Sequence, residues 1–226
     1  MIAFKSLRAG AVGPFSGFRW PRPDAGTPGS WVDSGEPLEM CVRGVHASRS
    51  DHLPYWISSE LWVVELEEPV IEQGHAVMAR RGRLLRLVEE WNGAAGRAFA
   101  ESCAASACEL AGRFLRDAGL LAEAEKLSAA EDIKEAGAIA ATLRAETSPP
   151  VADILGYATD AAAFAPQEIP ALIGHIAARA GGFESTGGVH DDEAYLAGVR
   201  SERDRQARWL VEHLGLYQVV GANRSP

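Results

Sequence analysis

Hydrophobic and polar positions follow two different patterns in the two parts of the chain. Up to residue 90, short apolar and β-branched runs alternate with Gly and Pro clusters, which is typical of strands and turns. We expect strands at residues 2–7, 38–45, 61–66, 70–79 and 83–88, with a turn at 80–82 before the last of them. Residues 21–35 are predicted to be a loop, and residues 50–57 a short helix that Ser50 or Asp51 caps.

From residue 91 onward, apolar positions recur every three or four residues, which predicts helices. The first helix covers 91–117, and its buried face consists of Phe99, Cys103, Ser106, Leu110 and Phe114. A second helix runs from a capping box at 128–131 to about residue 144. A third begins after Ser148 and ends near residue 165. A fourth runs from Pro166 to Gly181 and Gly182, and a fifth from the acidic residues 191–193 to about Leu214, with Gly215 as its left-handed cap.

These elements predict an α+β fold, in which a small β-rich N-terminal module packs on a C-terminal array of α-helices. The β-rich module covers residues 1–90 and the helical region covers 91–226. Whether these two parts are separate domains stays open at this point.

Composition narrows the classes of function. The chain has 226 residues, of which 47% are hydrophobic and 23% charged, as in ordinary globular proteins. Its net charge of −9 argues against nucleic acid and anionic membranes as partners. No apolar run approaches the ~20 residues of a membrane span, and the first residues lack a signal-peptide core. Three cysteines do not form a disulfide scaffold, so we expect a cytoplasmic protein.

Cys41, His46, His52 and His75 are the first group that could carry chemistry. Thiolate and imidazole groups bind zinc, but the four, five and twenty-two intervening residues do not match the spacing of a closed zinc site. A Cys–His nucleophile pair is a second hypothesis. We favour a half-buried cysteine and a histidine hydrogen-bonded at a strand end, and expect no tightly bound metal and no cofactor.

Aromatic residues are concentrated in the N-terminal part, where Tyr55, Trp56 and Trp62 follow Trp20 and Trp31. They could line an apolar ligand cleft. We favour the alternative that they form the core of a small module, because aromatic side chains dominate core burial.

Two further groups combine charge with a regular spacing. Four arginines lie within seven residues: Arg80, Arg81, Arg83 and Arg86. One hypothesis is that they bind phosphate or carboxylate groups. We favour the other, in which they pair with nearby glutamates on a solvated hairpin. In the last helix, one face carries Val199, Glu202, Arg203, Gln206, Leu210 and Leu214. The three polar residues predict a buried polar network or a face toward a cleft, and we favour the network.

The segment Cys41-x-x-Gly44-Val45-His46-Ala47 resembles a family of uncharacterised bacterial and phage proteins with a Cys-x-x-Gly-Phe/Val-His-Ala signature. The resemblance covers about fifty residues of this chain and implies a β-rich module without a known activity. A fainter similarity, to the ADP-ribosyltransferase-like fold, concerns His46 and the strand at 61–66, and it leaves that fold's full catalytic set unplaced. Dinucleotide-binding, Walker and zincin motifs do not occur.

These observations favour a ligand-binding protein, with enzymatic activity left open, whose cleft lies between the β module and the helices. The candidate ligand-binding residues are His46, Trp56, Trp62, His75, Arg81 and Arg203. One alternative is an interaction or adaptor protein that binds a protein partner through its acidic helices. Another is an ADP-ribosyltransferase-like enzyme.

Overall fold

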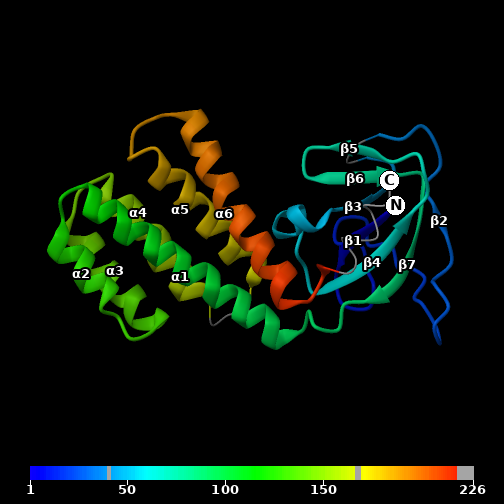
Figure 1. The fold of residues 1–226 in the computed structure, drawn as a ribbon, viewed down its shortest axis with the longest axis horizontal. Helices are drawn as coiled ribbons and strands as arrows, with labels where there is room; N and C mark the ends of the chain where they lie inside the picture. Colours follow the sequence, from blue (N-terminus) through cyan, green and yellow to red (C-terminus); the bar gives the residue numbers. More distant parts are fainter. Residues whose placement is uncertain (40–41, 166–168, 218–226) are drawn as a thin grey trace. The chain divides into compact units, whose positions relative to one another are not determined.

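The computed structural model describes residues 1–39, 42–165 and 169–217. It shows an α+β fold in which seven strands precede residue 88 and six α-helices follow residue 92 (Figure 1). The predicted fold class is therefore confirmed. The chain divides into two compact units: a β unit of residues 1–95 and 207–226, and a helical unit of residues 96–206.

Two antiparallel sheets form the β unit. One has the strand order β1-β4-β7-β2, from β1 (Ile2–Leu7), β4 (Glu60–Leu66), β7 (Arg81–Leu87) and β2 (Val32–Asp33). The other has the order β3-β6-β5, from β3 (Val45–Ala47), β6 (Ala76–Ala79) and β5 (Ile71–Gln73). Reciprocal backbone hydrogen bonds of 2.9 and 2.8 Å between Phe4 and Ser48 connect β1 to the end of β3.

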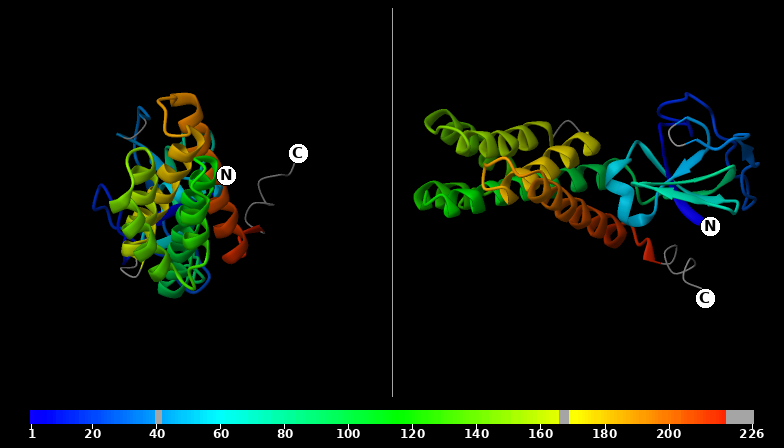
Figure 2. Two further views of the ribbon diagram at one scale, coloured as in Figure 1. Left: turned by 90° about the vertical axis from the view of Figure 1, so that its left-hand side faces the viewer. Right: turned by 90° about the horizontal axis from the view of Figure 1, so that it is seen from above.

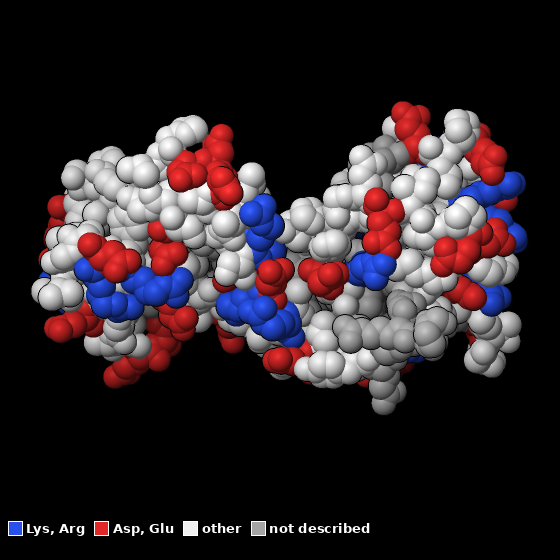
Figure 3. All heavy atoms as spheres, turned by 45° about the horizontal axis from the view of Figure 1, so that its top comes forward, with Lys and Arg blue, Asp and Glu red and all other residues white. Residues whose placement is uncertain are grey.

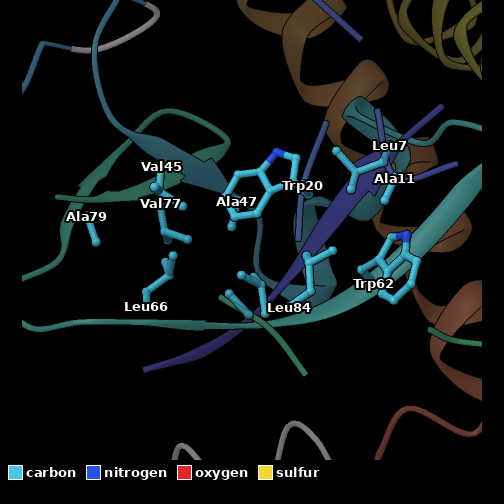
Figure 4. Close-up of a cluster of buried hydrophobic side chains, with 12 residues drawn as sticks. Leu7, Ala11, Trp20, Val45, Ala47, Trp62, Leu66, Val77, Ala79 and Leu84 are labelled. Carbon is cyan, nitrogen blue, oxygen red and sulfur yellow. The ribbon is translucent and has the colours of Figure 1, made fainter. Parts of the chain in front are cut away.

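The core of the β unit contains side chains from both sheets (Figure 4). Alternate residues of a strand point to the same face, so Ala3 and Leu7 of β1 join Val64 and Leu66 of β4 in this cluster. Trp20 comes from the loop after β1 and fills the same core. The alternation of the sequence thus translates into one shared apolar interior.

Lys5 is the polar exception in the core-facing row of β1, between Ala3 and Leu7. Its ammonium group lies 4.6 Å from the centroid of the Trp20 ring and donates a hydrogen bond to the carbonyl of His46. Burial lowers the pKa of Lys5 to about 8. The core therefore contains an amine that loses its proton more easily than an exposed lysine does.

A connected set of helices forms the helical unit (Figures 1 and 2). The helices are α1 (Gly93–Asp117), α2 (Leu121–Ser128), α3 (Ile133–Glu146), α4 (Val151–Phe164), α5 (Pro170–Ser185) and α6 (Asp192–His213). The first three residues of α1 and the last seven of α6 are assigned to the β unit. Within this unit α2 packs on α3, α3 on α4 and α4 on α5. No helix in the described part of the chain is long and apolar enough to cross a membrane.

Several predicted boundaries in the β unit were wrong. Of the strand expected at 38–45, residues 40 and 41 lie outside the described part of the chain, Glu39 and Arg43 form an isolated bridge, and β3 begins only at Val45. The strand expected at 70–79 is a hairpin, because the chain turns at Gly74, whose φ is +57°. The short helix at 50–55 is a 3₁₀ helix without a side-chain cap at its N-terminus, and the predicted loop at 21–35 contains the short strand β2.

Three predicted helix ends were also wrong. Asp132, rather than Ser128, caps α3, since its carboxylate accepts a hydrogen bond from the Glu135 amide. No side chain caps α4, whose N-cap is Pro150. Gly181 and Gly182 lie inside α5 and do not end it.

The predicted end of α5 at Gly181 and Gly182 was wrong because these glycines serve the packing of α5 against α6. A Cβ atom on Gly198 of α6 would lie 2.2 Å from the carbonyl oxygen of Gly181. The two glycines therefore allow the backbones of α5 and α6 to approach closely, and neither serves as a helix stop.

We expect Lys5→Met to remove a loss of folding stability that the buried Lys5 ammonium causes at neutral pH and that becomes smaller at high pH. Because the folded-state pKa of Lys5 lies below its ordinary value, the unfolded chain binds the proton more tightly. The stability of the wild type should therefore rise relative to Lys5→Met as the pH increases from 7 to 9.5, by about 2 kcal/mol. Urea denaturation of both proteins at the two pH values measures this difference, and an unchanged difference would contradict a lowered pKa.

Candidate functional site

The candidate residues named from the sequence occur in both units, and the structure assigns them different surroundings. His46, Trp56, Trp62, His75 and Arg81 belong to the β unit, whereas Arg203 belongs to the helical unit. Cys41, which was grouped with His46, lies outside the described residues.

Trp62 is part of the core of the β unit. Its ring is 3% exposed, and its indole N–H donates to a Glu60 carboxylate oxygen at 2.8 Å. The same carboxylate accepts hydrogen bonds from the amides of Gly10 and Ala11, at 2.7 and 2.9 Å. Trp62 and Glu60 therefore hold the loop after β1, and Trp62 packs as the core prediction expected.

Trp56 and His75 lie together at the surface of the β unit. The Trp56 indole donates to the carbonyl oxygen of His75 at 2.8 Å, and the His75 ring stacks on Tyr55 with 3.6 Å between ring centroids. His52 approaches His75 edge-on, at 5.1 Å between centroids. The aromatic rings thus pack on one another along the hairpin between β5 and β6.

Arg81 belongs to a series of ion pairs on β7. Arg81 pairs with Glu67 and Arg83 pairs with Glu65, at 2.8 and 2.7 Å. Both guanidinium groups lie against the Trp31 ring, 5.1 and 4.7 Å from its centroid. The arrangement matches the ion-paired alternative for the arginine cluster, in which opposite charges on neighbouring strands compensate each other.

His46 holds the turn before β3. Its Nδ1 atom hydrogen-bonds the carbonyl of Gly44 at 3.0 Å. Burial lowers the pKa of His46, the hydrogen bond to Gly44 opposes this, and the nearby Lys5 ammonium lowers the pKa further. His46 is therefore a neutral imidazole next to the Lys5 amine at neutral pH.

A buried polar network organises the helical unit. Glu202 accepts hydrogen bonds from the Ser106 hydroxyl, the Arg205 guanidinium and the Gln206 amide, each between 2.8 and 2.9 Å. The Gln206 amide also donates to the carbonyl of Gly174, at 2.9 Å. The Glu202 carboxylate therefore joins α6 to α1, and Gln206 joins α6 to α5, as the network hypothesis for the last helix predicted.

Arg203 extends this network toward α5. Its guanidinium donates to Gln206 Oε1 at 3.0 Å, and the residue is 6% exposed. Gln206 and Leu210 are completely buried, whereas Val199 is only half-buried. Val199, on the apolar face predicted for the last helix, is therefore less buried than Leu210 on the same face.

A cationic cluster forms around Arg203, and it consists of His175, Arg179 and Arg203. His175 and Arg179 lie one helical turn apart on α5, and both residues are exposed. The Arg179 guanidinium lies 5.6 Å from the centroid of the Tyr157 ring on α4. Tyr157 and Tyr195 both raise the pKa of Arg179, with Tyr157 the stronger influence.

Burial and two arginine charges act on the His175 imidazole of the cationic cluster. Loss of hydration lowers the pKa of His175, and the charges of Arg203 and Arg179 lower it further. Both charges that act on this imidazole are thus cationic. Arg179 and His175 form no ion pair with a carboxylate among residues 1–39, 42–165 and 169–217.

Figure 3 shows one face of the molecule, on which acidic side chains surround a few groups of basic ones. In a chain with a net charge of −9, the exposed basic residues His175 and Arg179 lie one helical turn apart on α5, and the charge of the buried Arg203 acts on His175. The cationic cluster is therefore our candidate functional site. No group of three potential metal ligands occurs in the described part of the chain.

Comparisons of the chain with protein-family models, curated proteins and solved structures found no match. The resemblances proposed from the Cys41–Ala47 segment stay predictions.

Sequence reasoning identified Arg203 but missed His175, Arg179, Tyr157 and Tyr195. The spacing of His175 and Arg179 on a predicted helix could have indicated a shared face. The two tyrosines join them only through the packing of three helices, for which the sequence carries no local signal.

We expect Gln206→Leu to destabilise the protein by about 1–3 kcal/mol, because Glu202, Arg203 and the Gly174 carbonyl each lose a buried partner. Thermal and urea denaturation measure the loss. The control is Ser201→Leu at an exposed position of the same helix, which should change stability by less than about 0.5 kcal/mol. Equal effects of the two substitutions would show that the network contributes little.

Proposed function

We propose that the protein binds a small anionic ligand, carrying a phosphate or carboxylate group, at the cationic cluster of the helical unit. The observation that carries this proposal is the exposed pair of His175 and Arg179, one helical turn apart on α5, with the Arg203 and Arg179 charges acting on the His175 imidazole. An anion placed among these groups would be attracted by the Arg179 and Arg203 charges, and it would favour the protonated form of His175.

The chemistry of the side chains suits an anion. Guanidinium groups match the geometry of phosphate and carboxylate oxygens through paired N–H donors. The imidazole of His175 adds a donor when protonated, and the hydroxyls of Tyr157 and Tyr195 can donate as well. The cluster thus combines potential donors from α4, α5 and α6.

Packing and hydrogen bonds between α1, α5 and α6 hold the helices that carry the cluster. The close approach of Gly181 and Gly198 sets the crossing of α5 and α6. The Glu202 carboxylate holds α6 against α1, and Gln206 holds it against α5. Binding side chains on packed helices keep their positions better than side chains on loops do.

Binding is the function that these groups support, and enzymatic activity stays open. The hypotheses of an adaptor protein and of an ADP-ribosyltransferase-like enzyme stay predictions, since neither gains support from a particular contact.

The test is calorimetric titration at low ionic strength with inorganic phosphate, pyrophosphate, acetate and citrate. Arg179→Gln and His175→Gln should each weaken binding about tenfold, as expected for the loss of a charge-assisted hydrogen bond. Arg116→Gln removes an exposed arginine of the same unit and should leave the affinity unchanged. A comparison of the affinities for the two phosphates with those for the two carboxylates identifies the class of anion that binds.

The proposal fails if none of the four anions binds at millimolar concentration. It fails equally if Arg116→Gln weakens binding as much as Arg179→Gln, which would indicate unspecific attraction. Circular dichroism of each variant shows that the fold is retained.

We also expect a characteristic pH dependence. Since protonated His175 attracts an anion, bound phosphate should raise the pKa of His175 toward or above its ordinary value. Affinity should therefore increase as the pH falls through this pKa. NMR titration of the histidine ring resonances, with and without phosphate, measures the pKa of His175 and the affinity. The resonance that is missing from the His175→Gln spectrum identifies His175. An unchanged pKa at saturating phosphate would show that the anion binds elsewhere.

A further inference from the structure

The loop after β1 contains a turn with exposed aromatic side chains, and we call residues 13–18 the aromatic turn. The Phe15 side chain at this turn is 89% exposed, and Phe18, three residues later, is 46% exposed. Single exposed apolar residues are common on protein surfaces, whereas neighbouring ones mark sites of interaction. The aromatic turn is therefore a candidate contact surface of the β unit.

Hydrogen bonds and ring packing give the aromatic turn a defined shape. The Gly13 amide donates to the carbonyl of Phe18 at 2.8 Å, and the Phe18 amide donates to the Ser16 hydroxyl at 3.2 Å. The Phe18 ring packs edge-on against Trp20, with 5.9 Å between ring centroids. Trp20 belongs to the buried core. The turn is thus attached to the core on one side, and it presents Phe15 to the solvent.

Two arginines flank the aromatic turn. Arg8 and Arg19 are exposed, and each forms an isolated antiparallel bridge with Val12. The Arg8 guanidinium donates to the carbonyl of Pro14, and the Arg19 guanidinium donates to the carbonyl of Gly10 at 3.5 Å. Within the part of the chain that the structure describes, neither arginine forms an ion pair with a carboxylate. Both charges therefore remain uncompensated beside the exposed rings.

The charge of this segment is opposite to that of the whole chain. The first 23 residues contain four basic residues and no acidic one. Residues 91–226 contain 12 basic and 19 acidic residues, so they carry −7 of the net charge of −9. The Glu60 carboxylate does reach the loop, where it accepts hydrogen bonds from the amides of Gly10 and Ala11. Charges more than about 8 Å apart are largely screened at physiological ionic strength, so the local positive charge decides what the turn attracts.

We propose that the aromatic turn is a contact site for anionic lipid bilayers. Phe15 and Phe18 enter the boundary between headgroups and acyl chains, and Arg8 and Arg19 bind the phosphates of the headgroups. Affinity for a bilayer surface increases with the apolar area buried and with the attraction of basic residues to anionic lipids. Guanidinium groups match the geometry of phosphate oxygens. The expectation that anionic membranes are not partners rests on the net charge, which averages over the whole chain.

The small size of the aromatic turn favours a bilayer over a protein partner. A stable protein interface buries roughly 800 Å² on each partner, and two phenylalanine side chains supply at most about 500 Å². A bilayer, in contrast, accepts a small apolar tip with flanking basic residues. The proposal does not rest on the anion site of the helical unit, because the aromatic turn belongs to the β unit.

The experiment is co-sedimentation of the intact protein with vesicles of phosphatidylcholine, alone or mixed with phosphatidylglycerol, at low and high salt. We expect binding to the mixed vesicles at low salt, at least about tenfold weaker binding to phosphatidylcholine alone, and a loss of binding at high salt. Phe15→Ser should weaken binding by about tenfold or more, because it removes apolar area. Arg19→Gln should weaken it about fivefold.

Matched variants in the helical unit are the controls. Val189→Ser changes an apolar residue that is 68% exposed, and Arg116→Gln removes an exposed arginine. Both should bind vesicles as the wild type does. Circular dichroism of every variant shows that the fold is retained.

A fluorescence measurement locates the contact. Phe15→Trp adds an indole to the turn, and brominated phosphatidylcholine in the mixed vesicles should quench the additional emission relative to the wild type. Absence of this quenching in bound protein would contradict insertion of the turn.

Three other outcomes would overturn the proposal. Failure of the wild type to bind either kind of vesicle would exclude the bilayer and leave a protein partner for the turn. Equal binding of Phe15→Ser and the wild type would show that the aromatic turn takes no part. Loss of vesicle binding in Arg179→Gln, with Phe15→Ser unaffected, would assign the headgroups to the cationic cluster instead.

Discussion

The arrangement of the helical unit depends on the buried carboxylate of Glu202. It accepts hydrogen bonds from Ser106 on α1 and from Arg205 and Gln206 on its own helix. A buried carboxylate is stable only when its oxygens are paired, so the network connects α6 to α1 and, through Gln206, to α5. These connections hold Arg203 next to α5, where the proposed anion site lies.

A second carboxylate has a comparable role in the β unit. Glu60 joins the loop after β1 to β4 through two backbone amides and the Trp62 indole. Hydrogen bonds to a charged acceptor are stronger than neutral ones. The loop in turn places Trp20 over the core and beside Lys5. In both units, therefore, a half-buried or buried acid holds the segment to which we assign a function.

Tertiary packing explains why several local signals misled. Gly181 and Gly182 are typical of a helix end, but they lie within α5 because α6 crosses there at backbone distance. Ser128 and Glu131 match a capping box, yet the nearby Asp132 caps the helix instead. Competing signals a few residues apart have similar local energies, and contacts with other helices decide between them.

The sequence by itself determined the α+β class, the change from strands to helices near residue 90, and the buried face of α1 with Phe99, Cys103 and Phe114. These follow from periodicity, which is a local property of the chain. It also predicted that Gln206 is buried in a polar network. Only the tertiary structure brought His175 and Arg179 to Arg203, and Lys5 to Trp20. Those neighbours are far apart in sequence, and their proximity results from how whole elements pack.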